Sequence, residues 1–193
     1  MSKSVKVYDF DNTIYDGDSM FDFYLFNLRK QPSLIRFLFF QSYHSVLFLC
    51  GLEDRTRAKT NFFSYLKGIR DVDARVSEFW NQNYSKLKSW YRETDHSSDV
   101  ILTASPEFLI KPVAEKLGAA KLIATLMDSE TGAINGQNCY GAEKVARLKL
   151  ELADYDIDEA YGDRESDMPV LKLARNAFLV TGDKVEQIAT KID

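Results

Sequence analysis

The latter half of the chain alternates short apolar runs with helical segments, and this alternation limits the possible fold more than any other feature. Apolar runs of strand length occupy 100–104, 121–126 and 177–180, another ends at Tyr161, and a matching run stands near the N-terminus at 5–7. Strands that alternate with helices form a mainly parallel sheet that helices cover on both faces. The sequence therefore predicts the α/β fold class, with a Rossmann-like, doubly wound sheet.

A helical block rich in aromatic residues interrupts this pattern after the first strand. Ten of the 13 phenylalanines and both tryptophans fall between Ser19 and Tyr91. Such a block can bury a small core of its own, separate from that of the sheet. Apolar residues at helical spacing predict helices around 20–28, 34–49, 55–66 and 72–91. We expect the Rossmann-like core to comprise residues 1–16 and 97–193, and the all-helical cap over the strand ends to comprise 17–96.

Three smaller structural features follow from local sequence. Turns at Thr131-Gly132 and Asn135-Gly136 predict a short β excursion across 128–140. Pro106 suits the first turn of a helix, because its missing N–H is not needed there. A final helix is expected from about Lys184.

Composition and charge narrow the class of protein. The hydrophobic and charged fractions, 45% and 28%, are typical of soluble globular proteins, and the net charge of −4 argues against a nucleic-acid partner. Cys50 and Cys139 match no metal or redox spacing, and no secretory signal peptide is visible, so a cytoplasmic location is expected. The 34–49 helix is shorter than the ~20 apolar residues that span a bilayer. No transmembrane span is expected, whereas peripheral contact of the cap with a membrane surface stays open.

Two carboxylates, those of Asp9 and Asp11, follow the first strand directly. Aspartate is a poor strand former and Asp-Asn-Thr favours a turn, so both acids are expected where the strand ends. In open α/β sheets, ligands bind at the carboxyl ends of the strands. Two such charges ~4 Å apart repel by about 4 kcal/mol, which a cation or a shared proton would relieve. By itself, the pair fits a solvated strand end equally well.

Three later segments place polar residues at comparable positions. Ser105 follows the run 100–104, where a hydroxyl and a backbone N–H can hold a phosphate oxygen or merely cap a helix. Lys144 opens a helix, where a cation is unfavourable unless it faces an anionic cluster. Asp163 and Asp167 form a second acidic pair after a strand, although a capped helix start would also explain them.

Taken in order, these segments resemble the four motifs of the haloacid dehalogenase-like superfamily. The helical insert between the first two motifs resembles that of the phosphoserine-phosphatase-like branch. Asn138-Cys139-Tyr140-Gly141, before Lys144, resembles phosphatidylglycerophosphatase-like members, whereas Pro106-Glu107 replaces the glycines usual in phosphoserine phosphatases. The segments that carry the resemblance are Asp9-Phe10-Asp11-Asn12-Thr13, Thr103-Ala104-Ser105, Lys144 and Gly162-Asp163-Arg164-Glu165-Ser166-Asp167.

The resemblance implies a Mg²⁺-dependent phosphomonoester hydrolase. Asp9 would be the nucleophile that forms an aspartyl-phosphate, Asp11 the general acid and base, and Lys144 the cation that stabilises the developing charge. The implied Mg²⁺ ligands are Asp9, the backbone carbonyl of Asp11, and Asp163, with Asp167 holding a bound water or orienting Lys144. The implied substrate contacts are Thr13, Asp18 and Ser105, with Thr103 as a weaker alternative to Ser105.

The substrate and the outcome of the reaction stay open at this point. The substrate would be a small phosphometabolite or a lipid phosphate similar to phosphatidylglycerophosphate. Phosphotransfer to an acceptor other than water, or a catalytically weak phospho-ligand-binding protein, are the alternatives. No partner is evident for His44 or His96, and the oligomeric state is open. A group of cap cations is interpreted first as a solvated face and second as a surface for an anionic or lipid phosphate: Arg29, Lys30, Arg36, Arg55, Arg57 and Lys59.

Overall fold

The protein contains one six-stranded sheet, and its computed structural model describes residues 3–152 and 155–189. The strand order is β3-β2-β1-β4-β5-β6. Neighbours from β3 to β5 pair in parallel, whereas β6 runs antiparallel to β5. The expected α/β, doubly wound, mainly parallel fold is confirmed. The strands are β1 (Lys3–Tyr8), β2 (Asp99–Pro106), β3 (Lys121–Thr125), β4 (Tyr155–Gly162), β5 (Asn176–Thr181) and β6 (Lys184–Ile188).

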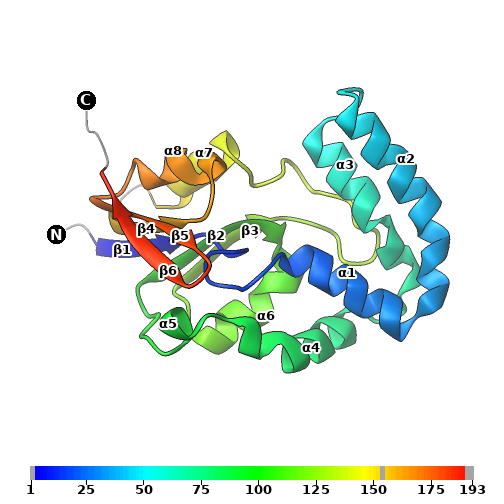
Figure 1. The fold of residues 1–193 in the computed structure, drawn as a ribbon, viewed down its shortest axis with the longest axis horizontal. Coiled ribbons are helices and arrows are strands. Elements are labelled where there is room, and N and C mark those ends of the chain that lie inside the picture. Colours follow the sequence, from blue (N-terminus) through cyan, green and yellow to red (C-terminus); the bar gives the residue numbers. More distant parts are fainter. Residues whose placement is uncertain (1–2, 153–154, 190–193) are drawn as a thin grey trace.

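Helices cover both faces of the sheet and also extend beyond its strand ends (Figure 1). The first five α-helices are α1 (Ser19–Lys30), α2 (Leu38–Leu49), α3 (Arg55–Phe62), α4 (Val72–Asn83) and α5 (Ser89–Arg92). The last three are α6 (Glu107–Leu117), α7 (Ala142–Glu151) and α8 (Met168–Leu171). Within the described ranges, four 3₁₀ segments lie between or beside them: η1 (Pro32–Phe37), η2 (Phe63–Gly68), η3 (Tyr84–Lys86) and η4 (Glu165–Asp167).

The inserted helices divide between two locations. Helices α1, α2 and α3 stand beyond the carboxyl ends of the strands, whereas α4 and α5 return to lie beside α6 (Figure 1). On the opposite face of the sheet, α7 packs on β2, and α8 packs on β4 and β5. The domain boundaries at 16/17 and 96/97 stay predictions. Among the described residues, none of the helices has the length and apolar character needed to cross a membrane.

The expectation of a separate helical core is wrong. One buried cluster joins Phe23 and Phe79 of the insert to Tyr8 and Phe10, at the end of β1, and to Leu109 of α6. The second cluster lies on the other face of the sheet, beneath α7 and α8. Because burying one large apolar side chain contributes about 1.5–3 kcal/mol, a shared core holds the inserted helices firmly on the sheet.

The C-terminal segment is a strand, not the expected helix. Thr181-Gly182-Asp183 turns the chain, with Gly182 at φ 58°, and β6 then pairs antiparallel with β5. Within β6, Val185 and Ile188 are partly buried while Lys184 and Glu186 are exposed. The strand therefore has the mixed exposure of a strand at the edge of a sheet. Hairpin pairing with β5 supplies backbone partners that a short C-terminal helix would lack.

Other local predictions differ by less. Within the segment 128–140 only Ile134 takes part in β pairing, through an isolated bridge to Met127, so the expected β excursion is absent from these described residues. Pro106 ends β2 and stands at the N-cap of α6, one residue before its first turn. The long helices expected over 34–49, 55–66 and 72–91 are each divided into a regular helix and one or more shorter pieces.

Candidate active site

Asp9 lies at the end of β1, with its backbone fixed by the neighbouring strand. Its N–H donates to the carbonyl of Tyr161 in β4, at 2.9 Å, so the sheet pairing continues to this residue. The side chain is buried, with 8% exposed. The chain then turns sharply at Asn12, which has a φ of 59°, a left-handed conformation that asparagine tolerates better than most residues. Asp9 and Asp11, two residues apart, have different partners: Lys144 for Asp9, and Ser19 and Ser105 for Asp11.

Lys144 joins two of the predicted acidic residues. Its Nζ donates to Oδ1 of Asp9 at 2.6 Å and to Oδ1 of Asp167 at 2.7 Å, and all three side chains are buried. Burial alone would lower the pKa of Lys144, but the two carboxylates outweigh it and raise that pKa. The lysine at the start of α7 therefore faces an anionic cluster, which explains a cation at an otherwise unfavourable helix position.

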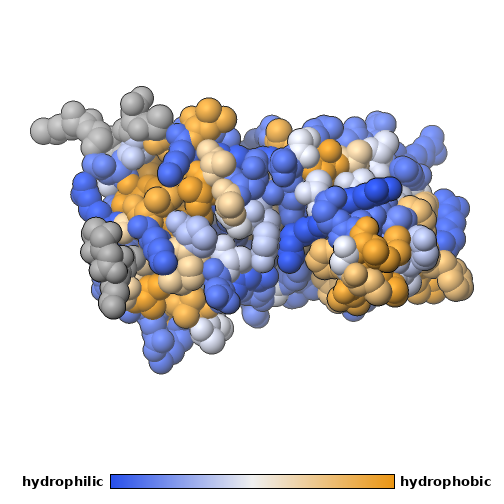
Figure 2. Space-filling model, turned by 90° about the horizontal axis from the view of Figure 1, so that it is seen from above, coloured by the Kyte–Doolittle hydropathy of each residue, from blue (hydrophilic) through white to orange (hydrophobic). Residues whose placement is uncertain are grey.

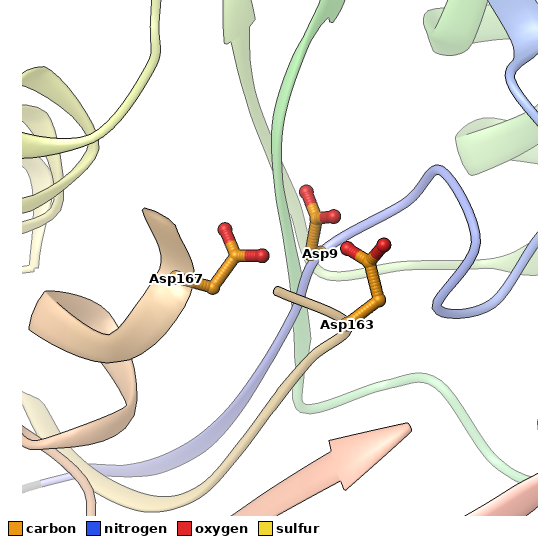
Figure 3. Close-up of side chains that lie close together, drawn as sticks. All are labelled: Asp9, Asp163 and Asp167. Carbon is orange, nitrogen blue, oxygen red and sulfur yellow. The ribbon is translucent and has the colours of Figure 1, made fainter. Parts of the chain in front are cut away.

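Three carboxylates converge at the same strand ends. Oxygen atoms of Asp9, Asp163 and Asp167 lie within 4.8 Å of one another, and Figure 3 shows the side chains directed toward a common point. Gly162 permits this approach, because a Cβ there would lie 2.7 Å from the Cβ of Asp167. Burial raises the pKa of Asp9 to about 7, against the opposing charge of Lys144.

The acidic cluster has the donor set of a divalent-cation site. Oδ2 of Asp167 is buried and has no hydrogen-bond partner, which is costly for a carboxylate oxygen. Hard cations such as Mg²⁺ prefer carboxylate oxygens. The three residues therefore fit the predicted metal, which would satisfy that oxygen and offset the repulsion among the acids. The carboxylate of Asp11 lies outside this cluster, and the role predicted for its carbonyl stays a prediction.

The carboxylate of Asp11 is held by two serines instead. The N–H of Ser19 donates to Oδ1 at 2.7 Å, and the hydroxyl of Ser105 donates to Oδ2 at 2.5 Å. Burial, and secondarily the charge of Asp18, raises the pKa of Asp11 against these hydrogen bonds. Ser105 thus links β2 to Asp11. A carboxyl group with a raised pKa keeps its proton to higher pH than an exposed aspartate does, which suits a proton donor.

A cleft of about 400 Å³ opens beside these groups, between the sheet and α1 to α3. Asp9, Asp11, Lys144 and Asp167 line one end of it. Asp18 also lines the cleft, while its side chain caps α1 by accepting from the N–H of Phe21 at 3.0 Å. The remaining lining residues are Met20, Phe21, Phe48, Arg55, Ala58, Lys59, Phe62, Phe63, Ala104, Asn138, Tyr140, Arg164 and Ser166.

The other predicted substrate contacts lie outside the lining of this cleft. Thr13 is fully buried and its hydroxyl has no hydrogen-bond partner. The hydroxyl of Ser105 is engaged by Asp11, and that of Thr103 accepts from the N–H of Ser105 at 3.0 Å. Asp163, which is a predicted metal ligand and not a substrate contact, accepts at Oδ2 a hydrogen bond of 2.9 Å from Nη2 of Arg164. The substrate roles of Thr13, Ser105 and Thr103 stay predictions.

Two cations of the cap, Arg55 and Lys59, line the cleft. Sequence analysis did not distinguish these two residues from the other cations of the cap. Nζ of Lys59 crosses from α3 to the sheet and donates to the carbonyl of Ala104 at 2.5 Å and to Oδ1 of Asn138 at 3.1 Å. The guanidinium of Arg55 lies over the ring of Tyr140, 4.2 Å from its centroid. In sequence both residues stand among several other cations, so spacing alone could not distinguish them.

Two other basic residues of the cap pair with acids outside the cleft. Lys30 pairs with Glu78, and Arg57 lies 3.3 Å from Glu53. Neither lines the cleft. Both histidines also have partners: His44 lies 3.0 Å from Glu53, and His96 lies 2.8 Å from Asp99.

Comparison with known proteins agrees with this arrangement of motifs. A sequence model described as haloacid dehalogenase-like hydrolase matches residues 7–172. The chain is 38% identical over 81 residues to Protein CicA of Caulobacter vibrioides, covering 39% of this chain and 36% of that protein. It is 34% identical over 93 residues to the Mycobacterium tuberculosis protein named Probable phosphatase Rv3661, covering 44% and 32%. The matches thus span about a third of the length of these curated relatives.

Solved structures share the fold over nearly the whole chain. A Bordetella pertussis Tohama I protein of unknown function superposes with a TM-score of 0.76 at 21% identity, covering 92% of this chain and 89% of that one. A Vibrio cholerae protein described as a probable phosphoserine phosphatase gives a TM-score of 0.67 at 15% identity, covering 91% and 55%. At these identities the similarity shows the fold alone.

Proposed function

The chain belongs to the haloacid dehalogenase-like hydrolase family, and from that premise we propose that it is a Mg²⁺-dependent phosphomonoester hydrolase that acts through an aspartyl-phosphate on Asp9. One observation carries the proposal. Lys144 bridges Asp9 and Asp167, while Asp163 brings a third carboxylate within 4.8 Å of both. Such a site combines a nucleophile, a fixed cation and the ligands of a metal beside an open cleft.

Asp9 is the proposed nucleophile because it combines three features at the end of β1, the position of the first aspartate of the family's first motif. It lies at the cleft, belongs to the acidic cluster and contacts Lys144. An oxygen of Asp9 forms a bond to phosphorus while the ester P–O bond breaks and the alkoxide leaves. Water then attacks the aspartyl-phosphate, which releases phosphate and regenerates the Asp9 carboxylate. A bound Mg²⁺, held by Asp9, Asp163 and Asp167, would neutralise charge on the transferring phosphoryl group.

Asp11 is proposed to move the protons of both steps. Its proton goes to the leaving alkoxide, and its carboxylate then takes a proton from the attacking water. Asp11→Asn is expected to lower kcat by about 10²–10⁴-fold, because the amide can do neither. Steady-state kinetics would measure the loss, with exposed Asp16→Asn from the same loop as the control. Unchanged kcat in Asp11→Asn, measured on a leaving group that needs protonation, would remove Asp11 from this role.

Metal binding can be tested without measuring turnover. Saturation to about a hundredfold over Kd adds about 2.7 kcal/mol to the free energy of unfolding. For a chain of this size, the melting temperature should rise by roughly 5–10 °C when Mg²⁺ is added. Asp163→Asn should lose most of this shift, whereas Asp73→Asn on the exposed side of α4 should keep it. An equal shift in Asp163→Asn would place the cation elsewhere.

Lys59 is proposed to contribute to phosphate binding in a pH-dependent way. Burial lowers the pKa of Lys59 to about 8, so its charge is present at neutral pH and lost in mild alkali. KM for a dianionic substrate should therefore increase as pH rises through about 8. Lys59→Met should raise KM by about tenfold at neutral pH and remove this pH step, because a charged contact is lost. Exposed Lys67→Met is the control, and a KM profile unchanged by Lys59→Met would contradict the role.

The lining of the cleft favours substrates whose leaving group is partly apolar. Beyond the charged end, the walls consist mainly of Met20, Phe21, Phe48, Phe62 and Tyr140. A panel of phosphomonoesters, including phosphoserine, sugar phosphates and phosphatidylglycerophosphate in micelles, tests this with and without chelator. Following the phosphoryl group in the presence of acceptor alcohols separates hydrolysis from transfer. No turnover of any member would favour a binding role for the scaffold.

A further inference from the structure

The outward side of η1 and α2 is apolar, and no other described part of the chain covers it. The exposed fractions reach 87% for Phe39, 81% for Leu49 and 75% for Leu52. Phe39, Tyr43, Val46 and Leu49 follow at helical spacing, so they share one side of α2. Figure 2 shows hydrophobic surface at the cap end of the molecule. We call this surface the α2 apolar face; its exposed members are Ile35, Leu38, Phe39, Tyr43, Val46, Leu49 and Leu52.

The inward side of α2 carries polar residues together with Phe48. Gln41 is buried, accepts from the hydroxyl of Tyr24 at 2.8 Å and donates to the carbonyl of Phe62 at 2.7 Å. His44 lies one turn further along and contacts Glu53 at 3.0 Å. A surface helix of a globular protein normally buries its apolar side and exposes its polar side. On α2 a row of large apolar residues is exposed instead, while Gln41 is buried, which indicates that the apolar side has a partner outside the chain.

Most of the exposed charged side chains within and next to this segment are positive. No acidic residue occurs between Pro32 and Leu52, and the only Lys or Arg there is the exposed Arg36. Exposed Arg29 precedes the segment, and exposed Asp54 and Arg57 follow it; the carboxylate of Asp54 caps α3 by accepting from the N–H of Arg57 at 2.9 Å. The nearest acid in sequence, Glu53, is buried and paired with His44 and Arg57. Apolar side chains rimmed by cations are the pattern of helices that lie in the surface of anionic membranes.

The face also adjoins the cleft. Phe48, on the inward side of α2, lines the cleft, and the guanidinium of Arg55 lies 5.5 Å from the centroid of its ring. One helix therefore separates the cleft from the apolar face. From these observations we propose that the α2 apolar face docks onto the surface of an anionic lipid bilayer. Docking would place the cleft beside the bilayer, so that a lipid phosphomonoester could pass from the membrane surface into it. This step rests on the proposed function.

A second copy of the chain explains the face less well. A twofold contact through this surface uses the same patch on both copies. The cationic rim around Arg36 would then face its own copy without an acidic counterpart on the segment. An anionic bilayer instead satisfies both features, because it accepts the apolar side chains and attracts the arginines.

Co-sedimentation of the intact chain with lipid vesicles tests the docking directly. The protein should sediment with vesicles of phosphatidylcholine that contain phosphatidylglycerol. It should sediment much less with vesicles of phosphatidylcholine alone, and added salt should weaken the binding, because screening reduces the attraction of the arginines. The readout needs no turnover, so a failure of the proposed hydrolase activity would leave this result interpretable.

Substitutions on the α2 apolar face, compared with a substitution elsewhere, test whether this face is the part of the protein that binds the vesicles. Phe39→Ser combined with Leu49→Ser should lower vesicle partitioning by at least about tenfold, because both side chains would insert. Leu150→Ser is the control, since Leu150 is also 81% exposed and its helix, α7, lies well away from α2 (Figure 1). Turnover of a soluble aryl phosphate should be unchanged in the double variant, because neither residue lines the cleft.

Three outcomes would overturn the docking proposal. The wild-type chain could fail to bind anionic vesicles, or the double variant could bind them as well as wild type does. Sedimentation velocity could also show a wild-type dimer that the double variant dissociates, with no vesicle binding by either. In that last case the α2 apolar face is an interface between copies of the chain.

Discussion

Asp9→Asn is expected to abolish phosphomonoester turnover, with kcat reduced by at least about 10⁴-fold, the order of loss seen when a catalytic nucleophile is removed. The amide is a poor nucleophile and cannot form the aspartyl-phosphate. The fold should persist, because Lys144 keeps its contact with Asp167 at 2.7 Å. Steady-state kinetics on a soluble aryl phosphate, with circular dichroism of the variant, would measure both effects.

The control for this variant is Asp16→Asn, which changes an exposed aspartate on the same loop. It should retain wild-type turnover. A folded Asp9→Asn protein that remains active, after removal of any contaminating phosphatase, would exclude Asp9 as the nucleophile.

Lys144→Met is expected to affect both stability and activity. The variant leaves the carboxylates of Asp9 and Asp167 buried without their shared cation. Removing one partner of a buried ion pair typically costs about 3–5 kcal/mol. For a chain of this size the melting temperature should fall by roughly 6–20 °C. Turnover should fall as well, because the lysine no longer neutralises charge on the phosphoryl group.

Lys149→Met on the same helix provides the comparison, because Lys149 is exposed. It should leave the melting temperature nearly unchanged. If the cluster binds a cation, Mg²⁺ should restore part of the stability lost in Lys144→Met. A melting temperature for Lys144→Met equal to that of wild type would mean that the Lys144 contacts contribute nothing to folding.

The sequence predicted the sheet and the family well for a definite physical reason. Buried parallel strands are continuous apolar runs, and the polar residues that follow them mark the strand ends where ligands bind. Asp9 and Asp163 could therefore be expected near one another from the strand ends, whereas the placement of Lys144 and Asp167 beside them came from the resemblance to the family's motifs. The resemblance to the haloacid dehalogenase-like superfamily is confirmed by the match across residues 7–172.

The predictions that were wrong concern elements whose structure depends on contacts between residues far apart in the sequence. Strand β6 differs from the predicted helix because it forms by pairing with β5 after the turn at Gly182. The periodicity of apolar residues does not indicate such a turn. The shared core around Phe23 and Phe79 depends on the return of α4 to α6. Likewise, the 34–49 segment is apolar on most sides, so only the buried contacts of Gln41 reveal which side faces outward.

Trapping the phosphorylated enzyme tests the central claim most directly. Wild-type protein would be quenched during turnover, reduced with borohydride and digested, and the peptide that contains residues 7–29 would be sequenced by mass spectrometry. Reduction of an aspartyl-phosphate converts that aspartate to homoserine, and we predict homoserine at position 9. Homoserine at another position, or robust turnover with no trapped residue, would contradict the account.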